Sequence, residues 1–342
     1  MEIVKTSIHK INHAANEVAI SNITPDNQDL TDYLNELLEK IANIDSRRKF
    51  QFSSDATEVL TRIGRILKDE EFEKETFAIA DRLMRKEQNA QSDISHLKHD
   101  IQKGVLFQIV FKQDDQYRLI ISKADHAAYL DETDLKRRQG LPEKKKTYKA
   151  FLVEFDDELA IERLFVYDTN ANIARYWWSD FLELKEYNTN ETNTDTAFDA
   201  ITRRVLSKIK EKFPSDHNIL KNRIIGYFRS NEGFEIDSFI ENAIGNYDPV
   251  DPNFKVKDFK KRLKELPEKE DFDSQFTIAP EVIKARKVRT IVPLNDKLDL
   301  YIKEYVPELN QVIKPYESGG VKYIQIRTDS GYEAFKQKTD AK

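Results

Sequence analysis

Cysteine is absent from this 342-residue sequence, which also holds only 9 glycines and 2 methionines. Without cysteine the chain has no disulfides, no thiolate nucleophile and no cysteine zinc site. No apolar run approaches the roughly 20 residues that a membrane helix needs. The opening Met-Glu-Ile-Val-Lys-Thr lacks a basic segment followed by an apolar one, which argues against secretion. We therefore expect a cytoplasmic protein with no membrane partner.

Short motifs of several large enzyme classes are missing as well. The sequence contains no glycine-rich phosphate loop ending in lysine, no GxGxxG turn, no HExxH pair and no GxSxG elbow. The common signals for nucleotide binding, zinc proteolysis and serine hydrolysis therefore fail. We assign no catalytic residue, no cofactor and no metal ligand, and we favour a protein that is not an enzyme.

Two weaker patterns keep a metal-dependent reaction open as an alternative. His96 and His99 would be neighbours on one helix face, but no third ligand converges on them. Glu154, Asp156 and Asp168 stand at expected strand ends, where carboxylates could hold magnesium in a nuclease or nuclease subunit. No lysine lies two residues after Glu154 to complete the usual nuclease pattern.

The chain is highly charged, and acidic residues outnumber basic ones. Charged residues make up 34% of the chain, the mean hydropathy is -0.67 and the net charge is -6. Any surface that binds nucleic acid must therefore be a basic patch confined to part of the molecule. Of four basic clusters, those at 203–212 and 255–264 carry more neutralising acids or an apolar stripe. The candidate DNA contacts come from the other two: Lys136, Arg137, Arg138, Lys144, Lys145, Lys146, Lys284, Arg286, Lys287 and Arg289.

Strand-like alternation is densest between Gly104 and Asp168, where two hairpins carry apolar residues on both faces. Such a sheet needs cover, which amphipathic helices before it can supply. We expect residues 1–187 to form a mainly antiparallel α+β sheet domain covered by these N-terminal helices. Further strands are expected at 3–11, 17–20 and 49–52, and helices at 29–41, 55–67 and 77–88, with Ser54 or Asp55 and Glu58 as a capping box. A short helix is expected to end at Gly140.

The rest of the chain predicts a helical segment and a small C-terminal β region. The polar run 188–194 is expected to be a loop and a domain boundary, and 248–253, with two prolines, a second boundary. The helical segment is 195–246, with Pro214 and Gly245 as helix stops, and the C-terminal α/β region is 254–342. Within that region we expect a helix at 256–266 and strands at 288–292, 298–302 and 321–326.

Aromatic residues gather after the last strand of the sheet domain. Tyr176, Trp177, Trp178 and Phe181 lie within six residues. Exposed rings could stack on bases, but a cluster this dense is more often part of a core or a subunit interface. We therefore interpret these four residues as candidates for core packing or for an interface.

Several segments resemble, in order, the bacterial nucleoid-associated NdpA family. They are the opening 3–11, the paired strands at 104–122, the strand Phe151–Phe155, and the ending from Arg289-Thr-Ile-Val-Pro-Leu294 through Lys322–Ile326. The resemblance implies a soluble, dimeric bacterial protein that associates with DNA and has no catalytic residues to transfer. The tryptophan pair and the asparagine-threonine run fall outside this resemblance and suggest a specialised task such as phage defence.

Our leading hypothesis is a non-enzymatic, nucleoid-located homodimer that binds double-stranded DNA with little sequence preference. The first alternative is the metal-dependent nuclease or nuclease subunit. The second is a protein-interaction component of a larger complex, whose charged surfaces contact a protein partner.

Overall fold

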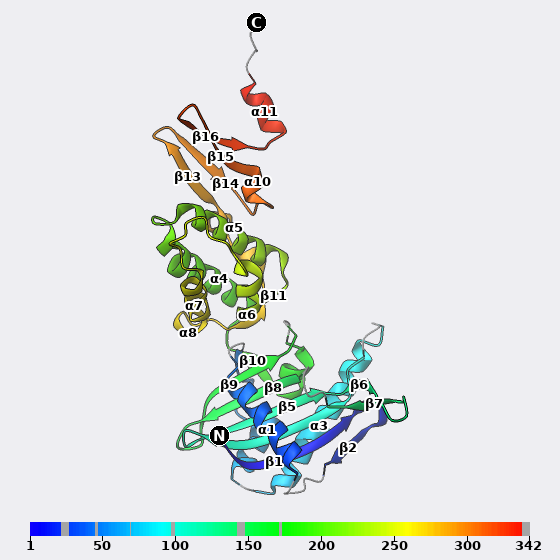
Figure 1. Ribbon diagram of the computed structural model, residues 1–342. Coiled ribbons are helices and arrows are strands. Elements are labelled where there is room, and N and C mark those ends of the chain that lie inside the picture. The colour runs from blue at the N-terminus through cyan, green and yellow to red at the C-terminus, as the bar shows by residue number, and fades with distance from the viewer. Residues whose placement is uncertain are drawn as a thin grey trace. The chain divides into compact units, whose positions relative to one another are not determined.

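The computed structural model describes residues 1–21, 27–44, 47–68, 70–96, 100–141, 148–170 and 173–336 (Figure 1). The chain forms two compact units. We call Met1–Asn190 with Asp273–Thr277 the sheet unit, and Glu191–Phe272 with Ile278–Lys342 the helical unit. The expected α+β class is confirmed, because helices accompany a large antiparallel sheet.

An eight-stranded antiparallel sheet is the centre of the sheet unit. Its strands, in spatial order, are β10 (Leu184–Glu186), β3 (Arg48–Phe52), β9 (Ile161–Asp168), β8 (Tyr148–Phe155), β5 (Gln116–Asp125), β4 (Gly104–Gln113), β1 (Glu2–Asn12) and β2 (Glu17–Ile20). The two hairpins expected from the alternation are β4–β5 and β8–β9, which lie in the middle of the sheet. β-Branched and aromatic residues favour these strands, and successive side chains point to opposite faces.

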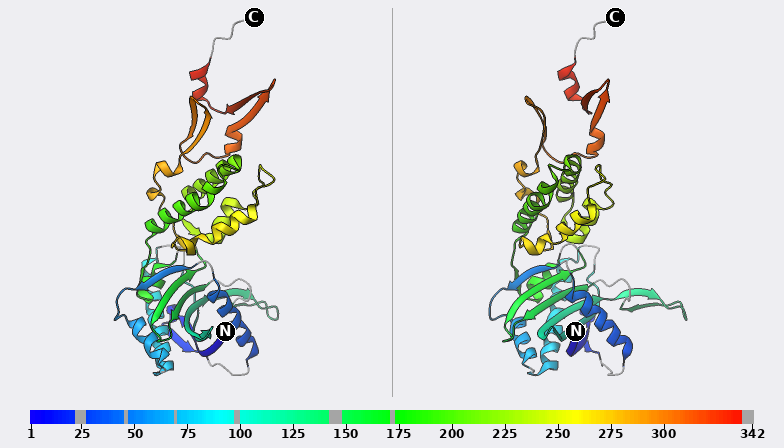
Figure 2. Two further views of the ribbon diagram at one scale, coloured as in Figure 1. Left: turned by 90° about the vertical axis from the view of Figure 1, so that its left-hand side faces the viewer. Right: turned by 60° about the vertical axis from the view of Figure 1, so that its left-hand side comes forward.

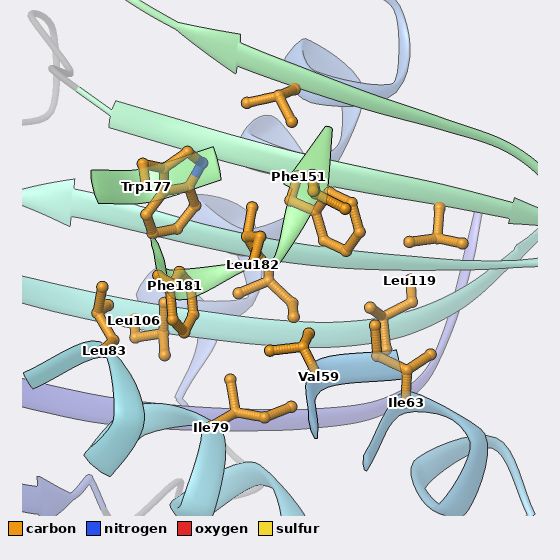
Figure 3. Close-up of a cluster of buried hydrophobic side chains, with 14 of the residues drawn as sticks. Val59, Ile63, Ile79, Leu83, Leu106, Leu119, Phe151, Trp177, Phe181 and Leu182 are labelled. Carbon is orange, nitrogen blue, oxygen red and sulfur yellow. The ribbon is translucent and has the colours of Figure 1, made fainter. Parts of the chain in front are cut away.

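Helices cover both faces of this sheet. One face packs against α1 (Gln28–Ala42), which buries Leu34, Leu37 and Ile41 with Phe107 and Leu152. The other face packs against α2 (Glu58–Leu67), α3 (Phe72–Asp93) and the π-helical segment η2 (Tyr176–Phe181). Figure 3 shows this second cluster, to which the helices contribute Val59, Ile63, Ile79, Leu83, Trp177 and Phe181.

Short segments complete the sheet unit. A 3-10 turn, η1 (His13–Ala15), follows β1. The segment that contains β12 (Gln275–Thr277) is held to the sheet by side chains. Asp273 Oδ1 accepts the Lys49 N–H at 2.9 Å, and Gln275 Nε2 donates to the Asp168 carbonyl at 3.0 Å.

The expected cap of α2 is wrong. Thr57, and not Ser54 or Asp55, caps this helix, because its Oγ1 accepts the Leu60 N–H at 3.4 Å. Glu58 does not complete a capping box with Asp55. Its carboxylate binds Arg62 at 2.9 Å and Arg82 at 2.6 Å instead. Contacts with guanidinium groups thus replace the local contact with a backbone N–H.

The short helix expected before Gly140 is also wrong. The segment forms a hairpin in which β6 (Ala127–Leu130) pairs with β7 (Arg137–Gly140), and Tyr129 lies opposite Arg138. Leu135 has a φ of 54° and its N–H donates to the Asp131 carbonyl at 2.8 Å, which closes a turn where a helix would continue. The hairpin extends away from the sheet in the views of Figure 2.

Aromatic side chains form the core of the helical unit. Phe228, Phe234 and Phe239 are fully buried, and each pair of their ring centroids lies between 5.2 and 6.0 Å apart. The helical unit is built from α4 (Asn190–Ala200), η3 (Ile201–Val205), η4 (Leu206–Ile209), α5 (Pro214–Ser230), β11 (Gly233–Glu235), α6 (Ile236–Phe239), η5 (Ile240–Ile244), α7 (Val256–Lys264), α8 (Leu266–Lys269), η6 (Pro280–Val282) and α9 (Ala285–Val288).

Helix boundaries in this unit only partly follow the expectation. Gly245, with a φ of 47°, ends η5 as expected. Pro214 starts α5, because a first-turn residue needs no N–H. The loop expected at 188–194 is wrong, since α4 already begins at Asn190. Thr194 is buried there and its Oγ1 accepts the Ala279 N–H at 3.0 Å, a tertiary contact that composition alone does not indicate.

Two hairpins follow α9 in the helical unit. β13 (Thr290–Asn295) pairs with β14 (Leu298–Ile302), and β15 (Ile313–Ser318) pairs with β16 (Val321–Ile326). The short helices α10 (Leu309–Val312) and α11 (Ser330–Phe335) flank the second hairpin. Three of these four strands were expected from the sequence, and β15 was not.

Helix α5 anchors the chain between the two hairpins. Asn222 Nδ2 donates to the Val306 carbonyl at 2.8 Å, and Asn222 Oδ1 accepts the Val306 N–H at 2.9 Å. Arg229 binds Glu304 at 3.0 Å. Gly226 makes room for the Tyr305 ring, because a Cβ added at Gly226 would lie 2.6 Å from it. The base of the hairpin pair is therefore held firmly on α5.

Candidate nucleic-acid interface

The β6–β7 hairpin, residues 127–140, carries the first set of expected DNA contacts. Lys136 and Arg138 are exposed, but Asp134 lies 3.9 Å from Lys136, and Asp131 and Asp134 lie 3.0 and 3.2 Å from Arg138. Arg137 is exposed and has no carboxylate partner among the described residues. Lys144, Lys145 and Lys146 lie outside the described residues. Arg137 is therefore the hairpin's clearest unneutralised cation.

The second expected set lies around α9 in the helical unit. Lys284, Arg286 and Arg289 are exposed, and within the described ranges no carboxylate pairs with them. Lys287 is different, because its Nζ lies 2.6 Å from Asp195 and 2.7 Å from Asp199 of α4. Burial alone would lower the pKa of Lys287, but hydrogen bonds to these two carboxylates raise it overall. Lys287 thus ties α9 to α4.

Basic residues of the helical unit that the sequence analysis did not propose lie next to the α9 set. His217 and Lys221 lie one turn apart on α5, and Lys221 Nζ donates to the Arg289 carbonyl at 2.7 Å. Burial and the nearby charge of Lys210 lower the pKa of Lys221. Burial, followed by repulsion from Lys221 and Lys210, lowers the pKa of His217 despite an opposing hydrogen bond to Asn218. The lowered pKa keeps His217 neutral near pH 7. We call Lys210, Lys221 and Arg289 the cation group.

Local repulsion distinguishes the cation group from the neighbouring basic residues. Arg203 is paired with Asp199 at 3.2 Å, and Arg204 with Glu270 at 2.9 Å. No carboxylate pairs with the three side chains of the group among the described residues, and Lys210 and Lys221 lie close enough for the charge of one to lower the pKa of the other. The sequence analysis had included Arg289 among its candidates and Lys210 in the basic cluster at 203–212, but it did not single out Lys221.

The acidic candidates for a metal site all have structural partners. Asp168 Oδ2 accepts from Lys149 Nζ at 2.7 Å, and Asp156 Oδ1 accepts the N–H groups of Glu158 and Ala160. Three arginines surround Glu154. His99 lies outside the described residues. In the part of the chain that is described, no three His, Cys, Asp or Glu residues are placed to hold a metal ion.

The aromatic cluster lies mainly inside the sheet unit. Trp177 and Phe181 are fully buried, and their ring centroids are 5.0 Å apart. Tyr176 and Trp178 are partly buried against the same core, and Trp178 contacts the Phe50 ring at 5.3 Å. These side chains stabilise the packing of η2 on the sheet and present little ring surface for base stacking.

Comparison with known proteins adds what the geometry alone leaves open. Residues 7–308 match the family model described as nucleoid-associated protein YejK. The chain belongs to this family of nucleoid-associated proteins. The match covers most of the central sheet, the helices α4 to α9 of the helical unit and the first C-terminal hairpin, and ends before β15. No curated protein sequence matched the chain. Among the described helices of this family member, none is both long and apolar enough to cross a membrane.

Proposed function

We propose that this protein is a non-enzymatic, DNA-associated component of the bacterial nucleoid, located in the cytoplasm, that binds duplex DNA with low sequence preference. Its membership of a nucleoid-associated family supports this function. The observation that carries the proposal is the cation group, because cations without local carboxylates are suited to backbone phosphates. Contacts with phosphate position a protein on DNA without reading its sequence.

The amount of charge fits binding that depends on salt. Each cation placed on a phosphate of duplex DNA contributes about 0.9 to the slope of log affinity against log salt. Lys210, Lys221 and Arg289 supply three such cations, and Arg286 and Lys284 extend the surface along α9. Arg137 of the β6–β7 hairpin offers a further contact from the sheet unit.

Fluorescence anisotropy with a labelled duplex of mixed sequence tests this function. We expect binding at about 50 mM salt that weakens steeply toward about 200 mM. The double variant Lys210→Gln/Lys221→Gln should lose roughly tenfold in affinity, and its salt slope should fall by about 2. Arg203→Gln/Arg204→Gln is the matched control, because carboxylates already neutralise these two arginines. Binding that salt does not affect, or equal losses in both variants, would contradict the proposal.

We further propose that the protein is a homodimer and that the C-terminal hairpins form the interface. Ten large apolar side chains between Ile291 and Ile326 are 37–59% exposed. With roughly 180 Å² for each large side chain, they expose on the order of 800 Å² in total. Because successive strand residues point to opposite faces, one face of the hairpins supplies part of the roughly 800 Å² that one partner of a standard interface buries. Isolated two-stranded hairpins are also only marginally stable in water, so this region gains from being covered.

Charge favours a second copy as the occupant of this surface. Residues 290–326 contain four lysines and five carboxylates, a nearly neutral mixture that does not suit DNA. Mixed signs allow a surface to face its own copy about a two-fold axis without net repulsion. The edges of the hairpins support pairing, because β14 and β16 contain no proline whereas β13 and β15 contain Pro293 and Pro315.

Sedimentation velocity measures the oligomeric state. We expect the wild type to sediment as a dimer and Ile324→Asp to sediment as a monomer, because a charge would be buried in the interface. Leu135→Asp, at an apolar position on the β6–β7 hairpin that is more exposed than Ile324, should remain a dimer. Circular dichroism checks that both variants are folded. A wild-type monomer, or a dimer that survives Ile324→Asp, would show that this surface does not join subunits.

A nuclease function is the alternative that the same preparation can test. Plasmid cleavage that requires Mg²⁺ and stops with EDTA would establish it. Because Lys149 binds Asp168 and arginines surround Glu154, we expect no such cleavage.

A role in phage defence, or as a component of a larger complex, is tested in cells. Phage plating on cells with and without the protein measures the first. A protein that co-purifies in fixed proportion, without nucleic acid, would favour the second over DNA association.

A further inference from the structure

The helix α7 carries a basic face that was not among the expected DNA contacts. Its apolar stripe consists of Val256, Phe259 and Leu263, of which Phe259 and Leu263 are buried in the helical unit. Four lysines follow the spacing i, i+3, i+4 and i+7, which places them together on the other side of the helix. They are Lys257, Lys260, Lys261 and Lys264, and we call them the lysine face.

Three of these four lysines have no carboxylate partner. Lys257, Lys260 and Lys261 form no ion pair among the described residues, which run without a gap from 173 to 336 in this part of the chain. Lys264 differs, because its Nζ lies 3.1 Å from Asp237 of α6. Lys257 and Lys261 are also exposed, so their ammonium groups are available to a partner in solution.

Positive charge remains on α7 when the neighbouring acids are counted. The nine residues of the helix contain five cations and one carboxylate, Asp258. Asp237 neutralises Lys264, and Glu265, just beyond the helix, pairs with Lys269 at 2.6 Å. Even with Asp258 set against one cation, three unmatched positive charges are left on this helix.

The stability of α7 does not account for the lysine face. The helix dipole favours cations in the last turn, where Lys261 and Lys264 lie, but disfavours them in the first turn, where Lys257 lies. Like charges four residues apart, such as Lys257 and Lys261, repel one another as well. A helix selected for stability alone would place acidic residues among these lysines, so the face is better explained by a partner.

The chemistry of the lysine face suits a phosphate backbone better than a protein. Lysine is depleted in protein–protein interfaces, which are enriched in aromatic side chains, methionine and arginine. The large apolar side chains of α7, Phe259 and Leu263, are buried and offer a protein partner no contact. The lysine ammonium is a compact point charge that binds phosphate without reading bases. The partner that fits is therefore the backbone of duplex DNA.

The lysine face and the cation group lie on different sides of the helical unit. Lys287 ties α9 to Asp195 and Asp199 of α4, whereas α7 packs mainly against η3, η5, α6 and α8. In both views of Figure 2, α7 (yellow) and α9 (orange) lie on opposite sides of the green helices α4 and α5. Duplex DNA is stiff over about 150 base pairs, so a single duplex would have to bend sharply to reach both surfaces.

We propose that the lysine face binds the backbone of a second DNA duplex, so that one protomer bridges two duplexes. This inference rests on the proposed DNA association, in which the cation group holds the first duplex. The protein then joins separate segments of DNA in addition to binding each of them.

A capture assay with the full chain tests this bridging. A duplex fixed to beads retains a labelled second duplex only when protein joins the two, and we expect capture at about 50 mM salt. Lys257→Gln/Lys261→Gln should lower capture roughly tenfold, while anisotropy still shows binding of one duplex through the cation group. Lys264→Gln/Lys269→Gln is the matched control, because carboxylates already neutralise both of these lysines.

The variant Ile324→Asp separates bridging by one protomer from bridging by a dimer. A dimer could hold one duplex on each subunit, so capture by the wild type alone does not locate the second surface. The monomeric variant should still join two duplexes, and Lys257→Gln/Lys261→Gln in the same background should not. Loss of capture in Ile324→Asp alone would overturn the inference.

The remaining outcomes distinguish this inference from the DNA-binding function. If the wild type binds a duplex but never joins two, or if the test and control pairs lose capture equally, the function stands and the inference is wrong. If the wild type binds no duplex, both are wrong. If Lys257→Gln/Lys261→Gln abolishes all duplex binding and Lys210→Gln/Lys221→Gln does not, α7 is the single DNA surface and bridging by two surfaces is rejected.

Discussion

The central strands of the sheet unit and the C-terminal hairpins of the helical unit use the same kind of sequence in opposite surroundings. Both are antiparallel, and both alternate β-branched, aromatic and polar residues. Phe107, Ile120 and Phe151 of the sheet are fully buried, whereas Tyr323, Ile324 and Ile326 of the last strand are nearly half exposed. Strand pattern therefore specifies the backbone, and burial depends on what packs against it.

The elements that pack against the strands explain this difference in burial. In the sheet unit α1, α2, α3 and η2 enclose eight strands within one chain. In the C-terminal hairpins, the described contacts with the helices hold mainly the base, through Asn222, Gly226 and Arg229 of α5. A partner must supply the missing cover if these apolar side chains are to leave water, which is why the dimer proposal belongs to this region.

The largest expected effect is the loss of folding stability when a buried side chain of the central sheet is truncated. Phe151→Ala should destabilise the sheet unit by about 3–5 kcal/mol, because it leaves a cavity where a fully buried ring packs. Tyr323→Ala, in an exposed strand, should cost the folded protomer under about 1 kcal/mol. Urea unfolding followed by tryptophan fluorescence measures the first, and circular dichroism measures the second. Similar losses for both would mean that the hairpins are as enclosed as the sheet.

A smaller expected effect is a loss of stability of the sheet unit in acid. Burial lowers the pKa of His9 to about 4, from an ordinary value of 6.5. Between those two values the unfolded chain takes up a proton that the folded chain refuses, so stability falls as the pH drops from about 6.5 to about 4. The shift corresponds to about 3 kcal/mol, and below about pH 4 this contribution changes no further.

Urea unfolding of the sheet unit at a series of pH values checks this dependence. His9→Gln cannot titrate and should remove this part of the loss. His96→Gln is the control, because His96 is exposed and its loss should leave the pH profile intact. An unchanged profile in His9→Gln would assign the acid sensitivity to other groups.

Much of the fold could be predicted from the sequence, because its elements depend on local pattern. Alternation at 105–121 and the apolar stripe from Leu30 to Ile41 each predicted an element and the fact that it is buried. Errors arose where a side-chain ion pair or a strand pairing overrode the local pattern. Arg62 and Arg82 drew Glu58 away from a cap, and pairing with β6 made a strand of residues expected to be helical.

The candidate sites were harder to predict for the same reason. Lys287 looked like a free cation within a basic string, but Asp195 and Asp199 neutralise it from another helix. Arg118, Glu154 and Arg163 come from three strands and meet only through strand register. Composition can require that positive charge be local in an acidic chain, but it cannot say which cations lack a carboxylate neighbour.

The smallest expected effect concerns Gly226, where α5 contacts the chain between the two C-terminal hairpins. In Gly64→Ala the new Cβ meets nothing within 4 Å, so the helix α2 should gain about 0.5–1 kcal/mol from propensity alone. In Gly226→Ala the same gain for α5 is opposed, because the Cβ would lie 2.6 Å from the Tyr305 ring. We expect little net change in stability there but faster proteolysis within residues 290–326, measured by limited digestion and mass spectrometry. If Gly226→Ala stabilises as much as Gly64→Ala and digestion is unchanged, the Tyr305 contact does not hold the hairpins, and a partner rather than α5 must order them.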